Sequence, residues 1–184
     1  MKKIFYLSSI ILLSSIVLYS CDLIVPKTAK WIDITELEEK KKKKMVVIEL
    51  YTPWCGWCKR MEKNTFNTPK IAQYLNKNFY AVKFNAEDRT PVTFMDKTYR
   101  FDSRAGNRGR HELATMLMTK NAKQGYPTIA FLDADYNLIQ AVPGYKNAEE
   151  FNAIMHYFSE EHYKTKKWDD FVKQFKENSL SPSE

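Results

Sequence analysis

Two cysteines only three positions apart, Cys55 and Cys58, follow a continuous run of β-prone residues at positions 45–51. Such a run is typical of a strand that is buried on both faces, as in the centre of a parallel sheet. Thr-Pro-Trp at 52–54 interrupts the run, and residues 55–63 contain no proline and predict a helix that begins at the cysteines. The sequence therefore predicts a dithiol at the junction between a buried strand and the amino end of a helix.

This position favours redox chemistry. The unpaired amide groups and the dipole at the amino end of a helix stabilise negative charge, so Cys55 is expected to ionise more readily than a free thiol. We expect Cys55 to attack a substrate disulfide, and Cys58, one helical turn away and more buried, to resolve the mixed disulfide. A disulfide that closes a four-residue loop adds little constraint to a fold, so a purely structural bridge is the weaker explanation.

The amino terminus predicts export and lipid attachment. Residues 1–20 begin with Met-Lys-Lys and continue with a mainly apolar stretch broken by serines, which is the layout of a secretory signal peptide. The end of this stretch, Leu18-Tyr19-Ser20-Cys21, resembles a bacterial lipobox, although Tyr19 is a looser fit. The resemblance implies that Cys21 is lipidated and that residues 21–30 tether the protein to a membrane of the cell envelope. An uncleaved anchor and an ordinary signal, in which Cys21 is incidental, are the alternatives.

The remaining sequence alternates predicted strands and helices. Thr35 and Glu38 have the spacing of a capping box, which predicts a helix over residues 35–43. Thr68 followed by Pro69 predicts the start of another helix, which reaches about residue 76. The order predicts an α/β sandwich around a mixed sheet. Further strands are predicted at 79–84, 128–133 and 138–142, further helices at 111–123, 148–159 and 168–176, and a hairpin-like insertion at about 86–110.

Several separated motifs resemble the thioredoxin family. Residues 54–59, Trp-Cys-Gly-Trp-Cys-Lys, are similar to that family's active-site signature, and Tyr126-Pro127-Thr128 is similar to its cis-proline loop, which faces the dithiol. The resemblance extends from about 46 to 158 and implies a thioredoxin fold, a three-layer sandwich over residues 31–184 that includes the insertion and an extra helical extension at about 160–178. It also implies that Pro127 is cis. The residues that it implies for contact with a peptide substrate are Trp54, Gly56, Trp57, Tyr126, Pro127 and Gly144.

The resemblance also implies an acid beneath the dithiol. Glu49 lies six residues before Cys55, where the family carries a buried acidic residue that helps to move the proton of the second cysteine. Burial would raise the pKa of Glu49, which could then act as a general base toward Cys58. Lys83 matches a lysine that neighbours this acid and supports it structurally. The alternative for Glu49 and Lys83 is a buried ion pair without a role in proton transfer.

Two departures from thioredoxin bear on function. The dipeptide between the cysteines is Gly56-Trp57 where thioredoxin has Gly-Pro, so the reduction potential of that protein does not transfer. The insertion is longer than the corresponding segment of thioredoxin and is expected to shape the choice of partner. It contains Arg100, Arg104, Arg108 and Arg110.

The most similar group is the thioredoxin-like lipoproteins of the bacterial envelope, which implies an enzyme that reduces disulfides of protein or peptide substrates. We expect no cofactor besides the Cys55–Cys58 pair, because the chain has only five glycines and no dinucleotide fingerprint. Electrons would then come from another protein, with a membrane electron donor as the expected partner. Nucleic acid is not expected as a partner, because much of the net charge of +7 comes from the leader and from the lysines at 40–44.

Two other functions compete with this prediction. A redox-inert module could use the groove near Pro127 to bind peptides or to position an envelope complex, although such a module needs no reactive dithiol. A metal-delivery protein would need ligands beyond two thiolates, since zinc typically takes four. The available histidines are His111, His156 and His162, and each is better explained by capping, packing or solvent exposure, so no metal ligands are assigned.

Overall fold

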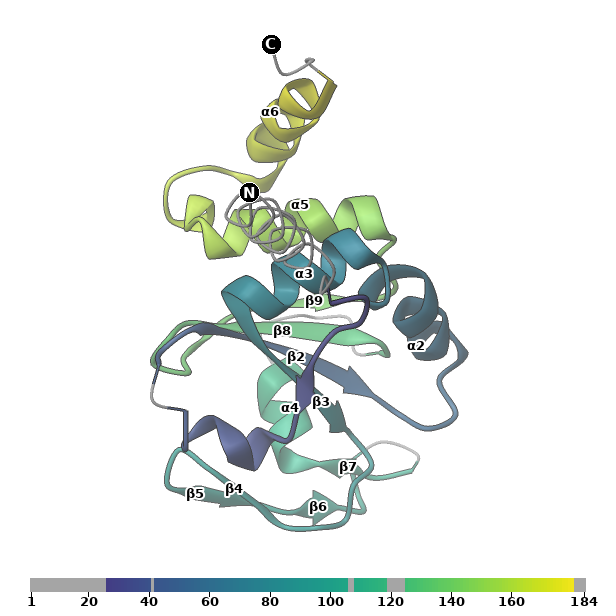
Figure 1. Ribbon diagram of the computed structural model, residues 1–184. Coiled ribbons are helices and arrows are strands. Elements are labelled where there is room, and N and C mark those ends of the chain that lie inside the picture. Colours follow the sequence, from purple (N-terminus) through teal and green to yellow (C-terminus); the bar gives the residue numbers. More distant parts are fainter. Residues whose placement is uncertain (1–25, 41, 106–107, 119–124, 181–184) are drawn as a thin grey trace, which may run out of the picture.

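A five-stranded mixed sheet forms the centre of the computed structural model, which describes residues 26–40, 42–105, 108–118 and 125–180 (Figure 1). The first three strands in the sheet are parallel, and the last two run antiparallel to their neighbours. In spatial order they are β1 (Trp31–Ile32), β3 (Phe79–Asn85), β2 (Met45–Tyr51), β8 (Thr128–Leu132) and β9 (Leu138–Pro143).

Strand β2 occupies the middle of the sheet because its side chains are buried on both faces. Val46, Ile48 and Leu50 belong to one hydrophobic cluster, together with residues of α4 (Glu112–Met118), whereas Val47 belongs to a second cluster. The second cluster contains residues of α3 (Pro69–Asn78) and α5 (Ala148–Ser159), which cover the opposite face of the sheet (Figure 1). Since successive side chains of a strand alternate between faces, Glu49 shares the face of Val47.

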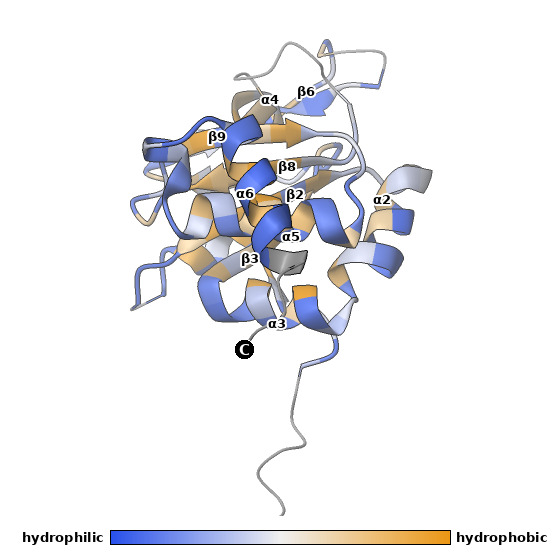
Figure 2. Ribbon diagram, turned by 90° about the horizontal axis from the view of Figure 1, so that it is seen from above, coloured by the Kyte–Doolittle hydropathy of each residue, from blue (hydrophilic) through white to orange (hydrophobic). Residues whose placement is uncertain are grey.

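Helices α3 and α5 begin at residues that are typical of helix starts. Thr68 is the N-cap of α3 and Pro69 its first residue, while Asn147 and Glu150 form a capping box at the start of α5. Helix α2 (Gly56–Met61) follows Cys55 and continues into a π-helical segment, η3 (Glu62–Phe66). Hydrophobic residues concentrate on the strands of the sheet, whereas α5 and α6 (Trp168–Leu180) carry many hydrophilic residues (Figure 2). The short helix η4 (His162–Lys164) joins α5 to α6.

The predicted insertion forms two short antiparallel pairs. Strands β4 (Val92–Phe94) and β5 (Lys97–Tyr99) make a hairpin, and β6 (Phe101–Asp102) pairs with β7 (Arg110–His111). The side chains of Phe94 and Tyr99 are buried in the cluster that contains α4, which holds the hairpin against the domain. The insertion is therefore packed onto the core through its aromatic residues.

The prediction of a helix over residues 35–43 is wrong in its cap and its length. The structure has a single 3₁₀ segment, η2 (Ile34–Leu37), whose N-cap is Asp33. The Asp33 carboxylate accepts a hydrogen bond from the amide of Thr35, and the amide of Asp33 donates to Glu36, both at 2.9 Å. The box thus forms two residues earlier than predicted. The lysine run that follows opposes further helix, because like charges three or four positions apart repel each other.

Some predictions concern residues outside the described ones. The leader, Cys21 and the first part of the tether lie there, and so does the end of the helix predicted at 111–123, of which the structure describes α4. The last helix is longer than the predicted 168–176. Among the described residues, no helix has the length and apolar character needed to cross a membrane.

Candidate functional site

The two cysteines of the motif form a disulfide at the start of α2. Cys55 is the N-cap residue, and its Sγ accepts a hydrogen bond of 3.0 Å from the amide of Cys58. The same amide would stabilise a thiolate on Cys55 after reduction. Each cysteine is 4% exposed, so the expected difference in burial between Cys55 and Cys58 is absent from the oxidised form. Gly56 is exposed, and no other atom lies within 4 Å of the place where a Cβ would stand.

The predicted cis-proline loop lies at the same end of the sheet as the disulfide. The Tyr126–Pro127 peptide bond is cis, as the sequence predicts. Thr128, the first residue of β8, pairs with Leu50 near the end of β2. Pro127 therefore lies close to the end of β2, from which the chain continues to Cys55. The aromatic rings of Trp54 and Tyr126 meet edge to face with their centroids 6.2 Å apart. The sheet therefore brings the dithiol segment and the cis-proline loop together.

Gly144 supports the cis-proline loop through its backbone. Its amide donates a 2.7 Å hydrogen bond to the carbonyl oxygen of Pro127, and its φ of +82° lies in the left-handed region that favours glycine. The Lys146 ammonium group donates to the carbonyl oxygens of Pro143 and Gly144 at 2.8 and 3.3 Å. The sequence analysis missed Lys146, and its position two residues after a turn glycine was the only available signal.

Trp54 is 53% exposed but is held by residues of the insertion. Its indole Nε1 donates to both carboxylate oxygens of Glu87 at 3.0 Å, and the Cζ atom of Arg108 lies 4.9 Å from the ring centroid. Glu87 and Arg108 line a cavity of about 380 Å³ together with Trp54, Arg110 and Tyr126. The insertion thus builds one wall beside the active-site motif, and Glu87 is a contact that the sequence analysis missed.

Trp57 lies on the other side of Cys55 in the motif and is 55% exposed. The centroid of its ring is 5.5 Å from that of Tyr145 and 5.2 Å from the Cζ atom of Arg60. Tyr145 follows Gly144, so Trp57 contacts the loop that supports Pro127. The sequence analysis missed Arg60 and Tyr145.

Glu49 is fully buried in β2, six residues before Cys55, and its burial agrees with the prediction. Neither carboxylate oxygen has a hydrogen-bond partner among the described residues, and the nearest cationic atom, Nζ of Lys83, is 3.7 Å away. Burial raises the pKa of Glu49 to about 7, against the smaller opposing effect of the Lys83 charge. Such a carboxyl group can exchange a proton near neutral pH.

Lys83 contacts a second acid, Glu62, at shorter range than Glu49. Glu62 and Lys83 line a cavity of about 280 Å³ that also reaches Cys58. The sequence analysis missed Glu62, although its position four residues after Cys58 places both on one side of a helix. The second cysteine therefore opens onto a cavity that contains a carboxylate and an ammonium group.

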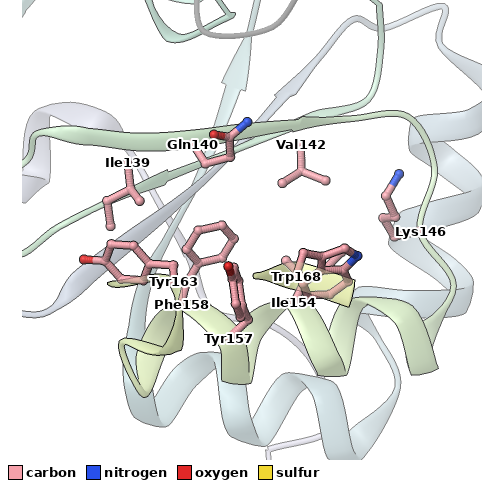
Figure 3. Close-up of a pocket in the computed structure, with 9 residues that line it drawn as sticks. All are labelled: Ile139, Gln140, Val142, Lys146, Ile154, Tyr157, Phe158, Tyr163 and Trp168. Atoms are coloured by element: carbon pink, nitrogen blue, oxygen red, sulfur yellow. The ribbon is translucent and has the colours of Figure 1, made fainter. Parts of the chain in front are cut away.

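A larger groove of about 550 Å³ lies away from the dithiol, between β9 and the C-terminal helices (Figure 3). Ile139 and Val142 project into it from β9, and Tyr157 and Phe158 from α5 (Figure 3). It is mainly apolar, and neither cysteine lines it.

The three histidines lie in structural contacts. His111 is buried, and its Nε2 atom is 3.1 Å from the carbonyl oxygen of Thr90. His156 and His162 both contact the carboxylate of Glu160. Within the part of the chain that the structure describes, no three side chains of His, Cys, Asp or Glu gather as a set of metal ligands.

Comparison with solved structures agrees with the fold. A thioredoxin-fold protein from Helicobacter pylori superimposes with a TM-score of 0.54 and 22% sequence identity, covering 76% of this chain and 87% of the other. At this identity the likeness supports the fold alone.

Curated relatives share sequence over the central part of the chain. The thiol:disulfide interchange protein DsbD of Pectobacterium atrosepticum is 29% identical over 116 residues, which are 62% of this chain and 16% of DsbD. DsbD of Haemophilus influenzae is 28% identical over 110 residues, 59% of this chain and 15% of DsbD. This chain thus spans about one sixth of the length of the relatives that it matches.

The sequence profile of a thioredoxin-like domain family matches residues 32–159, from β1 through the end of α5. The match includes the disulfide, the cis-proline loop and the buried acid. The chain therefore belongs to the thioredoxin-like domain family.

Proposed function

We propose that this protein reduces disulfides of protein substrates in the cell envelope through Cys55 and Cys58. The observation that carries the proposal is the disulfide at the start of α2, which lies beside a cis-proline loop and follows a strand that carries a buried acid, Glu49, with a pKa raised to about 7. A binding module that lacks redox activity has no need for this combination. The reductive direction is supported by the resemblance of the Gly-containing motif to those of reductases.

The reaction begins with the reduced protein. The Cys55 thiolate attacks one sulfur of the substrate disulfide, which forms a mixed disulfide and releases the other substrate sulfur as a thiolate that takes up a proton. Cys58 then transfers its proton to Glu49 and attacks the Sγ atom of Cys55. This second exchange forms the Cys55–Cys58 disulfide and expels the remaining substrate sulfur as a thiolate, which takes up the proton held by Glu49. The substrate thus gains two electrons from the two cysteines and two protons, one from Cys58 through Glu49 and one from solvent.

The exposed groups around the disulfide are assigned to substrate contact. Trp54 and Trp57 lie on either side of Cys55, and Tyr126 and Gly144 flank the cis-proline loop. Two aromatic rings that are half exposed next to a reactive disulfide offer apolar contact to a partner chain. Gly56 leaves the approach to the disulfide open, since nothing lies within 4 Å of its missing Cβ.

Reduction must be sustained by a second dithiol protein, which we assign to the membrane. Lipidation of Cys21 would hold the domain at the membrane surface, where a membrane-bound donor could reach it. The matched relatives are named thiol:disulfide interchange proteins, which supports disulfide exchange with protein partners and a place in the envelope.

The equilibrium reduction potential of Cys55 and Cys58 tests the direction. The full chain, kept in detergent, is equilibrated in defined dithiothreitol and glutathione buffers, and the free thiols are alkylated and counted. A potential near about −270 mV supports a reductase, whereas a value near about −120 mV indicates an oxidant. Failure to form the disulfide would overturn the proposal and favour a binding module.

The Cys55→Ser variant tests the assigned nucleophile. We expect it to lose exchange with a disulfide substrate, while Cys58→Ser accumulates the mixed disulfide because the resolving thiol is absent. Cys21→Ser, which removes the expected lipid site, serves as the matched cysteine control in detergent. Full exchange activity in Cys55→Ser would refute the mechanism.

A further inference from the structure

Cys55 stands between two exposed tryptophans in the sequence, Trp54 and Trp57, and each tryptophan carries an arginine. The Cζ atom of Arg108 lies 4.9 Å from the Trp54 ring centroid, and that of Arg60 lies 5.2 Å from the Trp57 ring centroid. Arg108 comes from the insertion and Arg60 from α2, so two unrelated segments place an arginine over the two tryptophans of the motif. A guanidinium group over an aromatic ring still presents N–H donors at its edge.

These two arginines are free to bind an external anion. Both are exposed, and among the described residues neither forms an ion pair with an acid. Arg60 has a second aromatic neighbour, Tyr145, with its Cζ atom 5.7 Å from the ring centroid. Its position is therefore fixed by two rings rather than by a carboxylate.

The acids near the disulfide are already engaged. Glu87, which shares the cavity with Arg108, receives the indole N–H of Trp54 on both carboxylate oxygens. Glu62, the first residue of η3, contacts Lys83. The cavity beside Trp54 holds two arginines, Arg108 and Arg110, against one glutamate, so its net formal charge is positive. Arg110 donates from Nε to the hydroxyl of Tyr126 at 3.2 Å, next to the cis-proline.

We propose that Arg60 and Arg108 select partner disulfides whose flanking residues are acidic. A partner segment that reaches Cys55 passes between the two tryptophans, and acidic side chains on either side of its cysteine meet the two guanidinium edges. Carboxylates suit this geometry because guanidinium groups bind them through paired N–H donors. The inference rests on the proposed disulfide exchange and identifies the class of substrate for it.

Three synthetic peptide disulfides test the selection. They are identical except for the residues that flank the cysteine, which are aspartate, glutamine or lysine. The rate constant for oxidation of the reduced full chain by each peptide is measured at low and high salt. An exposed ion pair contributes roughly a twofold effect, so two pairs should favour the acidic over the neutral peptide by about fourfold and disfavour the basic one.

Added salt tests the same point without any substitution. The preference of the wild-type protein should shrink toward unity at about 1 M salt, where charges are screened over about 3 Å. A preference that does not respond to salt would overturn the electrostatic explanation. The double variant Arg60→Gln with Arg108→Gln should react with the acidic and the neutral peptide at rates within about twofold of each other.

Arg104→Gln is the matched control. Arg104 belongs to the same insertion, but it pairs with Asp102 at 3.2 Å and does not line the cavity beside Trp54. We expect the control to retain the preference for the acidic peptide. An equal slowing with all three peptides in the double variant would refute the proposal, because it would show that the arginines act on the Cys55 thiol and not on the substrate.

The two proposals fail in different ways. If all three peptides oxidise the reduced wild-type protein at the same rate, the selection is refuted while disulfide exchange stands. If it reacts with none of them, disulfide exchange fails, and the selection fails with it.

Discussion

Glu49 and Lys83 lie directly opposite each other on the parallel strands β2 and β3, yet the lysine makes its closer contact with Glu62. Their charged atoms are 3.7 Å apart, and the buried carboxylate keeps both oxygens without a hydrogen bond among the described residues. Lys83 is thus shared between a buried acid and a half-buried one. This arrangement leaves Glu49 poorly compensated in its ionised form, which is the physical basis of its raised pKa.

The raised pKa predicts that Glu49 lowers stability as the pH rises. The folded protein holds this proton up to a pH of about 7, whereas the unfolded chain releases it near the ordinary value of 4.5. Between these pH values ionisation of Glu49 favours the unfolded state. The free energy of unfolding has therefore fallen by roughly 3 kcal/mol once the pH exceeds 7. Urea unfolding of the wild type and of Glu49→Gln from pH 4 to 8 measures this fall in the free energy of unfolding.

The difference in the free energy of unfolding between the wild type and Glu49→Gln isolates the titration of Glu49, because the two proteins share all other titrating groups. We expect Glu49→Gln to gain stability relative to the wild type as the pH rises from about 4.5 to about 7, with no further change above that range. A constant difference across the whole range would contradict a raised pKa in the folded protein.

The same substitution should slow the second step of the reaction. Without a carboxylate at position 49, Cys58 has no buried base to accept its proton, and general-base catalysis typically contributes about a hundredfold or more. The mixed disulfide of Glu49→Gln with a substrate peptide should therefore persist longer, as measured by acid quench and mass spectrometry. Glu39→Gln, an exposed acid replaced in the same way, is the control. Equal lifetimes in Glu49→Gln and the wild type would remove Glu49 from the mechanism.

Replacement of Lys83 should move the titration of Glu49 upward. The positive charge of Lys83 lowers the pKa of Glu49, so Lys83→Met removes this effect and leaves burial unopposed. The midpoint of the pH dependence of mixed-disulfide resolution should rise by about one pH unit. Lys70→Met, which removes an exposed lysine from α3, should leave the midpoint unchanged. A downward shift in Lys83→Met would contradict the assigned effect of the Lys83 charge on the pKa of Glu49.

Local signals in the sequence predicted most of the elements that position the site. The apolar run predicted the bounds of β2 correctly, and Thr68 with Pro69 predicted the start of α3, because both depend on side chains within a few residues. The prediction of a helix from residue 35 was wrong because two equally local signals conflict there. Two capping pairs compete there, and the pair formed by Asp33 and Glu36 prevails over Thr35 and Glu38.

The contacts around the dithiol were predictable only in part. The resemblance located Glu49 and Pro127, whereas the partners of Trp54 come from an insertion whose path no local pattern determines. The sequence analysis noted four arginines in that insertion, but it could not show which of them reaches the disulfide. Arg108 lies over Trp54, while Arg104 pairs with Asp102 instead. Such choices depend on tertiary packing between segments that are far apart in the chain.

Gly144 should be intolerant of a side chain because of its backbone conformation. At a φ of +82° an alanine costs about 1–2 kcal/mol, even though the nearest atom to its Cβ, Nζ of Lys146, is 3.8 Å away. Gly144→Ala should therefore lower the free energy of unfolding by that amount. Since the Gly144 amide holds the carbonyl oxygen of Pro127, the variant should also slow disulfide exchange. Chemical denaturation and peptide reduction rates measure the two effects.

Gly56→Ala is the matched control for the stability measurement. Gly56 is the first residue of α2, its φ is not in the left-handed region, and nothing lies within 4 Å of the added Cβ. Alanine is favoured over glycine within a helix by up to about 1 kcal/mol, so this variant should be as stable as the wild type or more stable. If Gly144→Ala were equally stable, the left-handed conformation would not be required there. The loop that supports Pro127 would then have to be held by the Lys146 ammonium group and its carbonyl contacts.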